Sequence, residues 1–205
     1  EVVSPQAQIP LKHSRPNREI ADIAYLEAAA GLIFCAQRPV ILVGHSAVRN
    51  KASDALLEFT RKLHIPVVNT MMAKGMIPYD DPYSMWTVGI PQKDYQNVIL
   101  EKADLVIAVG YDIVEYAPGK WNSSGEHKIL HIDTRPSHIN KLYQPDVEVV
   151  GDISESLRQI MLRCNRCDEP EWAFDIRDKM REEIRSYEND SSFPMKPEKI
   201  LCDVR

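Results

Sequence analysis

Four apolar runs in this chain each end in a small cluster of glycine and polar residues, and these clusters are the residues best suited to bind a ligand. A carboxylate at the end of a strand accepts hydrogen bonds from ribose hydroxyls, and backbone N–H groups at the start of a helix can face an anion. In open α/β sheets, ligands bind in the crevice beyond the carboxyl ends of the strands. The four clusters are Gly44-His45-Ser46-Ala47, Gly110-Tyr111-Asp112, Asp133-Thr134 and Gly151-Asp152.

Each cluster has a structural interpretation beside the ligand-binding one. Gly44 is a single glycine where the dinucleotide fingerprint GxGxxG has three, so it indicates either an anion site or a tight turn from strand to helix. Asp152 suits ribose hydroxyls, but capping the next helix is the favoured interpretation. Of the six histidines, His45 is expected near a ligand and His131 is expected in the core of a strand.

Motifs of known catalytic or metal chemistry are missing from the sequence. It contains no GxSxG, Walker A or HExxH motif. Cys164 and Cys167 form a single CxxC, which offers too few ligands for tetrahedral zinc, and Cys35 is expected in the core. Asp112 and Glu115 have no neighbour that would make them an acid–base pair, so residues 111–116 are interpreted as a solvated or interface loop. We expect a nucleotide-type binding module without catalytic residues of its own.

The elements that position these clusters are predicted from hydrophobic patterning. Continuous apolar runs predict strands buried on both faces at 39–43, 66–70, 104–109, 128–132 and 147–150. Apolar residues at helical spacing predict helices at 18–36 with Asn17 as cap, at 51–63, 95–102 and 152–162, within 168–190, and a helical turn at 137–140. The stretches 71–98 and 111–126 are predicted to be largely irregular.

The alternation of strands and helices predicts an α/β fold, a doubly wound and mostly parallel sheet of five to six strands with helices on both faces. Residues 1–16 are expected to be a linker from another domain, 17–165 the central α/β domain, 166–195 a helical extension and linker, and 196–205 the start of a further domain. The net charge of −5 and the lack of an apolar stretch of about 20 residues argue against nucleic acid and membrane partners. A cytoplasmic protein is expected.

Several stretches resemble the central domain of thiamine-diphosphate-dependent enzymes, over about residues 17–162. The specific ones are Ala73-Lys74-Gly75 followed by Pro78, and a block after residue 108. That block contains Val109-Gly110-Tyr111-Asp112, Glu115-Tyr116, Pro118 and Trp121-Asn122. Within the superfamily the chain is most similar to the catabolic, flavin-independent acetolactate synthases.

The resemblance implies a three-domain enzyme that condenses two pyruvates to acetolactate with loss of CO2. In that family the first domain carries a glutamate that activates thiamine diphosphate, and the third carries a GDG…N motif for Mg²⁺ and diphosphate. Neither motif occurs here, so both cofactors are expected in the full-length enzyme and not on this chain. The chain alone is expected to be inactive and largely structural. Its expected partners are the enzyme's own N- and C-terminal domains and further copies in a dimer or tetramer.

The resemblance also bears on FAD, which flavin-containing relatives hold along the strand ends of this domain. Carried over by motif, the matching cofactor-binding positions are Gly44, Thr70, Met71, Gly89, Gly110, Asp133, Thr134, Gly151 and Asp152. The flavin-binding relatives have an Arg-Phe-Asp-Asp-Arg-like block after the position of Gly110, where this chain has Tyr111-Asp112-Ile113-Val114-Glu115. The loss of two cations beside a diphosphate argues against FAD, because it removes charge-assisted hydrogen bonds.

Two alternatives stay open. One is the central domain of another thiamine diphosphate enzyme, a 2-oxo acid or oxalyl-CoA decarboxylase, that binds FAD or ADP. A basic pocket at Arg49, Lys74 or Arg135 would favour ADP. The other is a standalone nucleotide-binding module, against which the apparent remnants of neighbouring domains argue.

Overall fold

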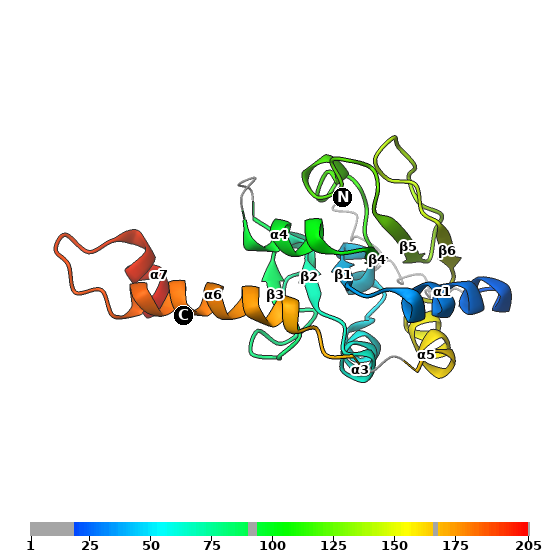
Figure 1. The fold of residues 1–205 in the computed structure, drawn as a ribbon, viewed down its shortest axis with the longest axis horizontal. Coiled ribbons are helices and arrows are strands. Elements are labelled where there is room, and N and C mark those ends of the chain that lie inside the picture. The colour runs from blue at the N-terminus through cyan, green and yellow to red at the C-terminus, as the bar shows by residue number, and fades with distance from the viewer. Residues whose placement is uncertain (1–18, 90–93, 166–167, 205) are drawn as a thin grey trace, which may run out of the picture.

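The computed structural model describes residues 19–89, 94–165 and 168–204. Its strands are β1 (Pro39–Val43), β2 (Val67–Asn69), β3 (Ser84–Thr87), β4 (Leu105–Val109), β5 (Lys128–Asp133) and β6 (Val147–Val150). They form one parallel sheet in the order β3-β2-β1-β4-β5-β6, with helices on both faces (Figure 1). The predicted doubly wound α/β fold is confirmed, as are the five predicted strands.

The sixth strand, β3, was not predicted and lies at the edge of the sheet. Its pairing with β2 is interrupted by a register shift between Val67 and Asn69. Trp86 within it has a φ of 65°, which is uncommon for a bulky residue and bends the strand. The strand therefore lacks the continuous apolar run that revealed the other five.

The helices are α1 (Ile23–Cys35), α2 (His45–Arg49), α3 (Ser53–Leu63), α4 (Tyr95–Lys102), α5 (Ile153–Arg163), α6 (Glu171–Glu188) and α7 (Pro197–Val204). Two 3₁₀ turns, η1 (Met71–Ala73) and η2 (Pro118–Lys120), lie in the stretches predicted as irregular. The short helix α2 was not predicted, because five residues carry too little periodicity.

Two helix predictions are wrong. The first helix begins five residues later than predicted, because the Asp22 carboxylate accepts from the N–H of Ala24 at 2.9 Å and caps it. Ile23, expected on the buried stripe, is 60 % exposed. The predicted cap Asn17 lies outside the described residues. No helical turn forms at 137–140, where Asn140 instead bridges to Tyr143.

Each face of the sheet has its own hydrophobic core. Ile41, Val43 and Ile107 point to the face covered by α1, α3 and α5. Leu42 and Val106 alternate with them and point to the opposite face, which α4 and α6 cover. Successive strand residues face opposite sides, so burial on both faces requires an apolar residue at every position.

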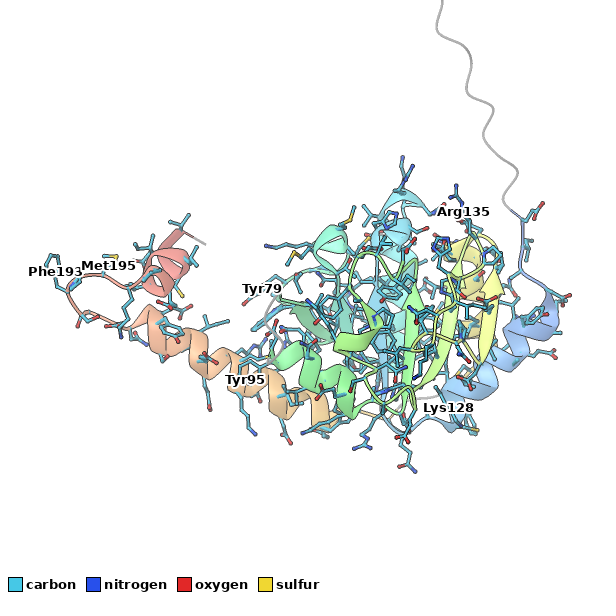
Figure 2. All side chains as sticks on the ribbon, turned by 90° about the horizontal axis from the view of Figure 1, so that it is seen from above. Tyr79, Tyr95, Lys128, Arg135, Phe193 and Met195 are labelled. Carbon is cyan, nitrogen blue, oxygen red and sulfur yellow. The ribbon has the colours of Figure 1, made fainter. Side chains whose placement is uncertain are left out.

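The C-terminal helices form an arm that begins on the sheet and extends away from it (Figure 2). The first half of α6 buries Ala173, Ile176 and Met180 in the second core, whereas α7 buries no residue. The buried guanidinium of Arg177 donates to the carbonyl oxygens of Asp80, Asp81 and Pro82 and fixes α6 to the loop before β3.

The cysteines form no metal site within the described residues. Cys35 is exposed, so its predicted place in the core is wrong, whereas Cys164 is buried. Cys167 lies outside the described residues. No group of three or more potential ligands among His, Cys, Asp and Glu occurs in the described part of the chain. No described helix is long and apolar enough to cross a membrane.

Candidate functional site

The carboxyl ends of β1, β4 and β5 meet the short helix α2 where the strand order reverses. The N–H of Gly44 donates to the carbonyl of Val109, and the N–H of Ser46 donates to that of Gly110, both at 3.0 Å. A Cβ on Gly44 would lie 2.6 Å from Gly110 O, so the tight-turn interpretation of Gly44 describes the observed geometry. Such a switch point is where open α/β sheets bind ligands.

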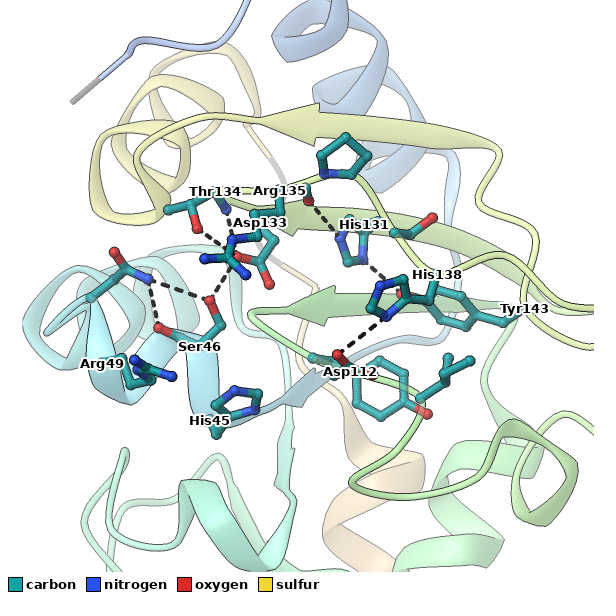
Figure 3. Close-up of a pocket in the computed structure, with 15 residues that line it drawn as sticks. His45, Ser46, Arg49, Asp112, His131, Asp133, Thr134, Arg135, His138 and Tyr143 are labelled. Carbon is teal, nitrogen blue, oxygen red and sulfur yellow. Dashed lines mark hydrogen bonds and ion pairs between the residues drawn. The ribbon is translucent and has the colours of Figure 1, made fainter. Parts of the chain in front are cut away.

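A polar pocket of about 470 Å³ opens beside this turn (Figure 3). One side is formed by His45, Ser46 and Arg49 of α2, and the other by Asp133 and the residues that follow it at the end of β5. A pocket of this size can enclose a small ligand. The remaining lining residues are Asn50, Tyr111, Asp112, Ile113, His131, Thr134, Arg135, Pro136, Ser137, His138 and Tyr143.

Asp133 is the most strongly held carboxylate of the pocket. Its Oδ1 accepts from Ser46 Oγ at 2.7 Å, from the N–H of Thr134 at 2.5 Å and from Thr134 Oγ1 at 3.1 Å. Its Oδ2 makes no hydrogen bond to the described residues, although the residue is only 8 % exposed. The fixed carboxylate therefore keeps one oxygen that can accept from a ligand hydroxyl.

Two arginines supply positive charge to the pocket. Arg49 comes from α2 and Arg135 from the segment after β5, and neither forms an ion pair with a described residue. Lys74, the third residue considered for a basic pocket, lies instead in a separate hollow beside Val48 and Lys51. The pocket thus combines two guanidinium groups with one partly satisfied carboxylate.

The floor of the pocket is neutral and aromatic. His131 Nδ1 lies 2.8 Å from Tyr143 Oη, and both residues are buried, which confirms His131 as a core residue. Burial lowers the pKa of His131 and raises the pKa of Tyr143 well above its usual value, because both charged forms lose solvation. Neither side chain is therefore charged near neutral pH.

Glu115 is the residue whose role the sequence did not reveal. Both of its oxygens lie 3.0 Å from the N–H of His45, and Oε1 accepts from His45 Nδ1 at 2.6 Å. Oε2 accepts from Thr70 Oγ1 at 2.7 Å, and the N–H of Asp112 donates to Oε1. Its side chain is 1 % exposed, so the prediction of a solvated loop is wrong for Glu115. The available signal was its place in the Glu115-Tyr116 block of the resemblance.

The nine predicted cofactor positions lie along the carboxyl edge of the whole sheet. Of these nine, only Asp133 and Thr134 line the pocket. Gly44 after β1 and Gly110 after β4 pack against each other beside it, and Thr70 contacts Glu115. Met71 is exposed on η1, and Gly89 beyond β3 donates its N–H to Asp94.

The last two predicted positions have structural contacts at the end of β6. A Cβ on Gly151 would lie 2.8 Å from the backbone nitrogen of Ala21. Asp152 caps α5 by accepting from the N–H of Glu155 at 2.9 Å, as the favoured interpretation held. The assignment of the nine positions to a cofactor stays a prediction.

The sequence model of the thiamine pyrophosphate enzyme central domain matches residues 26–160, more than half of the chain. The chain belongs to this family. The central domain is 36% identical over 137 residues to an acetolactate synthase of Bacillus subtilis (strain 168), covering 66% of this chain and 24% of the relative. It is 30% identical over 210 residues to a probable acetolactate synthase large subunit of Methanocaldococcus jannaschii, covering 96% of this chain and 34% of the relative. The chain therefore spans about a quarter to a third of the length of these curated relatives.

Proposed function

We propose that this chain is the central domain of a thiamine-diphosphate-dependent carboligase that condenses two pyruvates to acetolactate and releases CO2. The observation that carries the proposal is the match of 96% of the chain to a relative named as a probable acetolactate synthase large subunit. The all-parallel sheet with its ordered strand-end clusters is consistent with that match.

The role of this chain in such an enzyme is structural. Thiamine diphosphate supplies an electron sink for the decarboxylation of a 2-oxo acid. The described residues contain no three-ligand metal cluster, and the activating glutamate and GDG…N motifs are missing from the sequence. We therefore assign thiamine diphosphate and Mg²⁺ to other domains of the enzyme and derive no step from residues of this chain.

The same proposal covers the partners. The N- and C-terminal domains of the enzyme and further copies in a dimer or tetramer are the partners we propose, in a cytoplasmic enzyme. The exposed apolar residues of the arm, Phe193, Met195, Ile200, Leu201 and Val204, are available to contact them.

Activity of the whole protein tests the proposal. The protein containing this chain is incubated with pyruvate, thiamine diphosphate and Mg²⁺, and acetolactate and CO2 are quantified. We expect one acetolactate for each CO2, and no product from residues 1–205 alone. Release of acetaldehyde without acetolactate would identify a decarboxylase instead, and turnover by residues 1–205 would contradict the structural role.

The decarboxylase alternative is the second candidate, favoured by one observation. Arg49 and Arg135 both line the pocket beside Asp133, as an ADP site would require. If ADP at 100 times its dissociation constant binds the folded chain alone, it should raise the free energy of unfolding by about 2.7 kcal/mol. A thermal-shift titration with ADP measures this, and no response would remove the support for this candidate.

A further inference from the structure

The carboxyl edge of the sheet is divided into two unequal parts. On the β5 side lies the pocket with Asp133, Arg49 and Arg135. On the side of β1 and β2, the space over the strand ends contains the side chain of Glu115. His45 stands between the two parts, since it lines the pocket and binds Glu115 through Nδ1.

The Glu115 carboxylate already accepts the hydrogen bonds from the donors that an anionic ligand would need over β1 and β2. The N–H and ring N–H of His45 and the hydroxyl of Thr70 all point to its carboxylate, at 2.6 to 3.0 Å. The fit is close, because a Cβ on Gly44 would lie 2.6 Å from Glu115 Oε1. A diphosphate at this place would have to displace the carboxylate or bind beside it without those donors.

A flavin dinucleotide in contact with the predicted positions must cross this part of the edge. Those positions run from Gly89 beyond β3, through Thr70 and Gly44, to Gly151 after β6. A buried carboxylate on that path excludes the ligand by volume and by like charge. The residues on this path therefore do not fit FAD.

We propose that Glu115 is a built-in anion that occupies the crevice over β1 and β2 and makes this domain independent of FAD. The inference holds whichever reaction the whole protein catalyses, because it concerns only residues of this chain. It also leaves the smaller pocket at Asp133 open to a ligand that does not span the edge.

The first test uses the unmodified chain. Equilibrium dialysis against FAD is expected to leave no flavin on the protein, and FAD is expected to leave its unfolding temperature unchanged. Retention of one FAD per chain would overturn the proposal.

The second test asks whether the site is built for an anion. Glu115→Ala is expected to lower the unfolding temperature by roughly 5–15 °C, because it leaves several buried donors without an acceptor. Formate, compared with chloride at equal ionic strength, is expected to recover part of this loss by entering the space of the lost carboxylate. The matched control is Glu126→Ala, which removes an exposed carboxylate. Its unfolding temperature is expected to equal that of the wild type and to stay the same when formate replaces chloride.

The outcomes separate an anion site from an ordinary buried contact. Recovery by formate in Glu115→Ala, but not in the wild type or in Glu126→Ala, supports the proposal. Equal effects of formate on all three proteins, or none on any, overturn it. If Glu115→Ala does not fold, Glu115→Ser is used in the same comparison.

Discussion

At the scale of single residues, two glycines of this chain are under opposite constraints. Gly110 has a φ of 60°, and a Cβ there would lie 2.2 Å from the backbone nitrogen of Ala47. Gly31 lies within α1, and a Cβ there would meet no atom within 4 Å. One position requires glycine, whereas the other merely tolerates it.

Alanine substitutions at both positions should therefore change stability in opposite directions. Gly110→Ala is expected to cost about 2–5 kcal/mol, from left-handed strain together with overpacking against backbone. Gly31→Ala is expected to add about 0.5–1 kcal/mol, because glycine in a helix loses more chain entropy on folding. Urea denaturation measures both, and a neutral Gly110→Ala would show that the contact between the end of β4 and α2 can relax.

His131 makes stability depend on pH near neutrality. Its pKa is lowered by burial, so at mildly acidic pH the unfolded chain takes up a proton that the folded chain resists. This contribution to stability is complete above the usual histidine pKa of about 6.5 and declines as the pH falls below it. His131→Asn, whose amide can still bond Tyr143, is expected to show a smaller stability difference between about pH 7.5 and 5.5. If the free energy of unfolding changed equally between these two pH values in the wild type and in His131→Asn, this role would be contradicted.

The difference between Asp152 and Glu115 shows which site residues the sequence can reveal. Asp152 caps a helix three residues away, so its partner is local and the pattern alone favoured the contact. Glu115 binds residues that are 70 and 45 positions away in sequence. Only the tertiary fold brings those strand ends together, and no local pattern carries that information.

At the scale of elements, α5 depends on its N-terminal cap. Asp152→Ala is expected to lower the free energy of unfolding by about 1 kcal/mol, because the N–H of Glu155 loses its acceptor. Asp152→Asn serves as the matched control and should lose less, since asparagine caps nearly as well. Equal losses would indicate that the negative charge matters more than the hydrogen bond. Circular dichroism during denaturation gives both values.

Whether an element can be predicted from the sequence depends on how many of its faces are buried in the core. Four of the five predicted strands contribute residues to both cores and appear in the sequence as continuous apolar runs. The fifth, β6, was predicted from its valines, although it is an edge strand that buries only Val149 in one core and leaves Val150 exposed. The edge strand β3 pairs on one side, includes Trp86 at positive φ and was missed. The start of α1 was misplaced because Ile20 and Ile23 fit the helical spacing but are exposed, which periodicity alone does not distinguish.

At the scale of the whole molecule, α6 closes the second face of the sheet. The family match ends at residue 160, and the predicted domain ends at 165, but Ile176 and Met180 of α6 complete the core that contains Leu42 and Val106. Because one β-sheet face cannot stay exposed to water without loss of stability, we expect the arm to belong to the folding unit as far as Met180. The boundary at 165 stays a prediction that truncation can test.

Two truncated chains separate the contributions of α6 and α7. Burial of an isoleucine and a methionine contributes roughly 3–6 kcal/mol, a large share of the 5–15 kcal/mol by which domains are usually stable. A chain ending at residue 165 is therefore expected to unfold at a much lower urea concentration than the full chain. A chain ending at residue 190 loses α7, which buries nothing, and is expected to unfold close to the full chain. If the chain ending at 165 is as stable as the longer ones, α6 is only an attachment and the folding unit ends where the family match does.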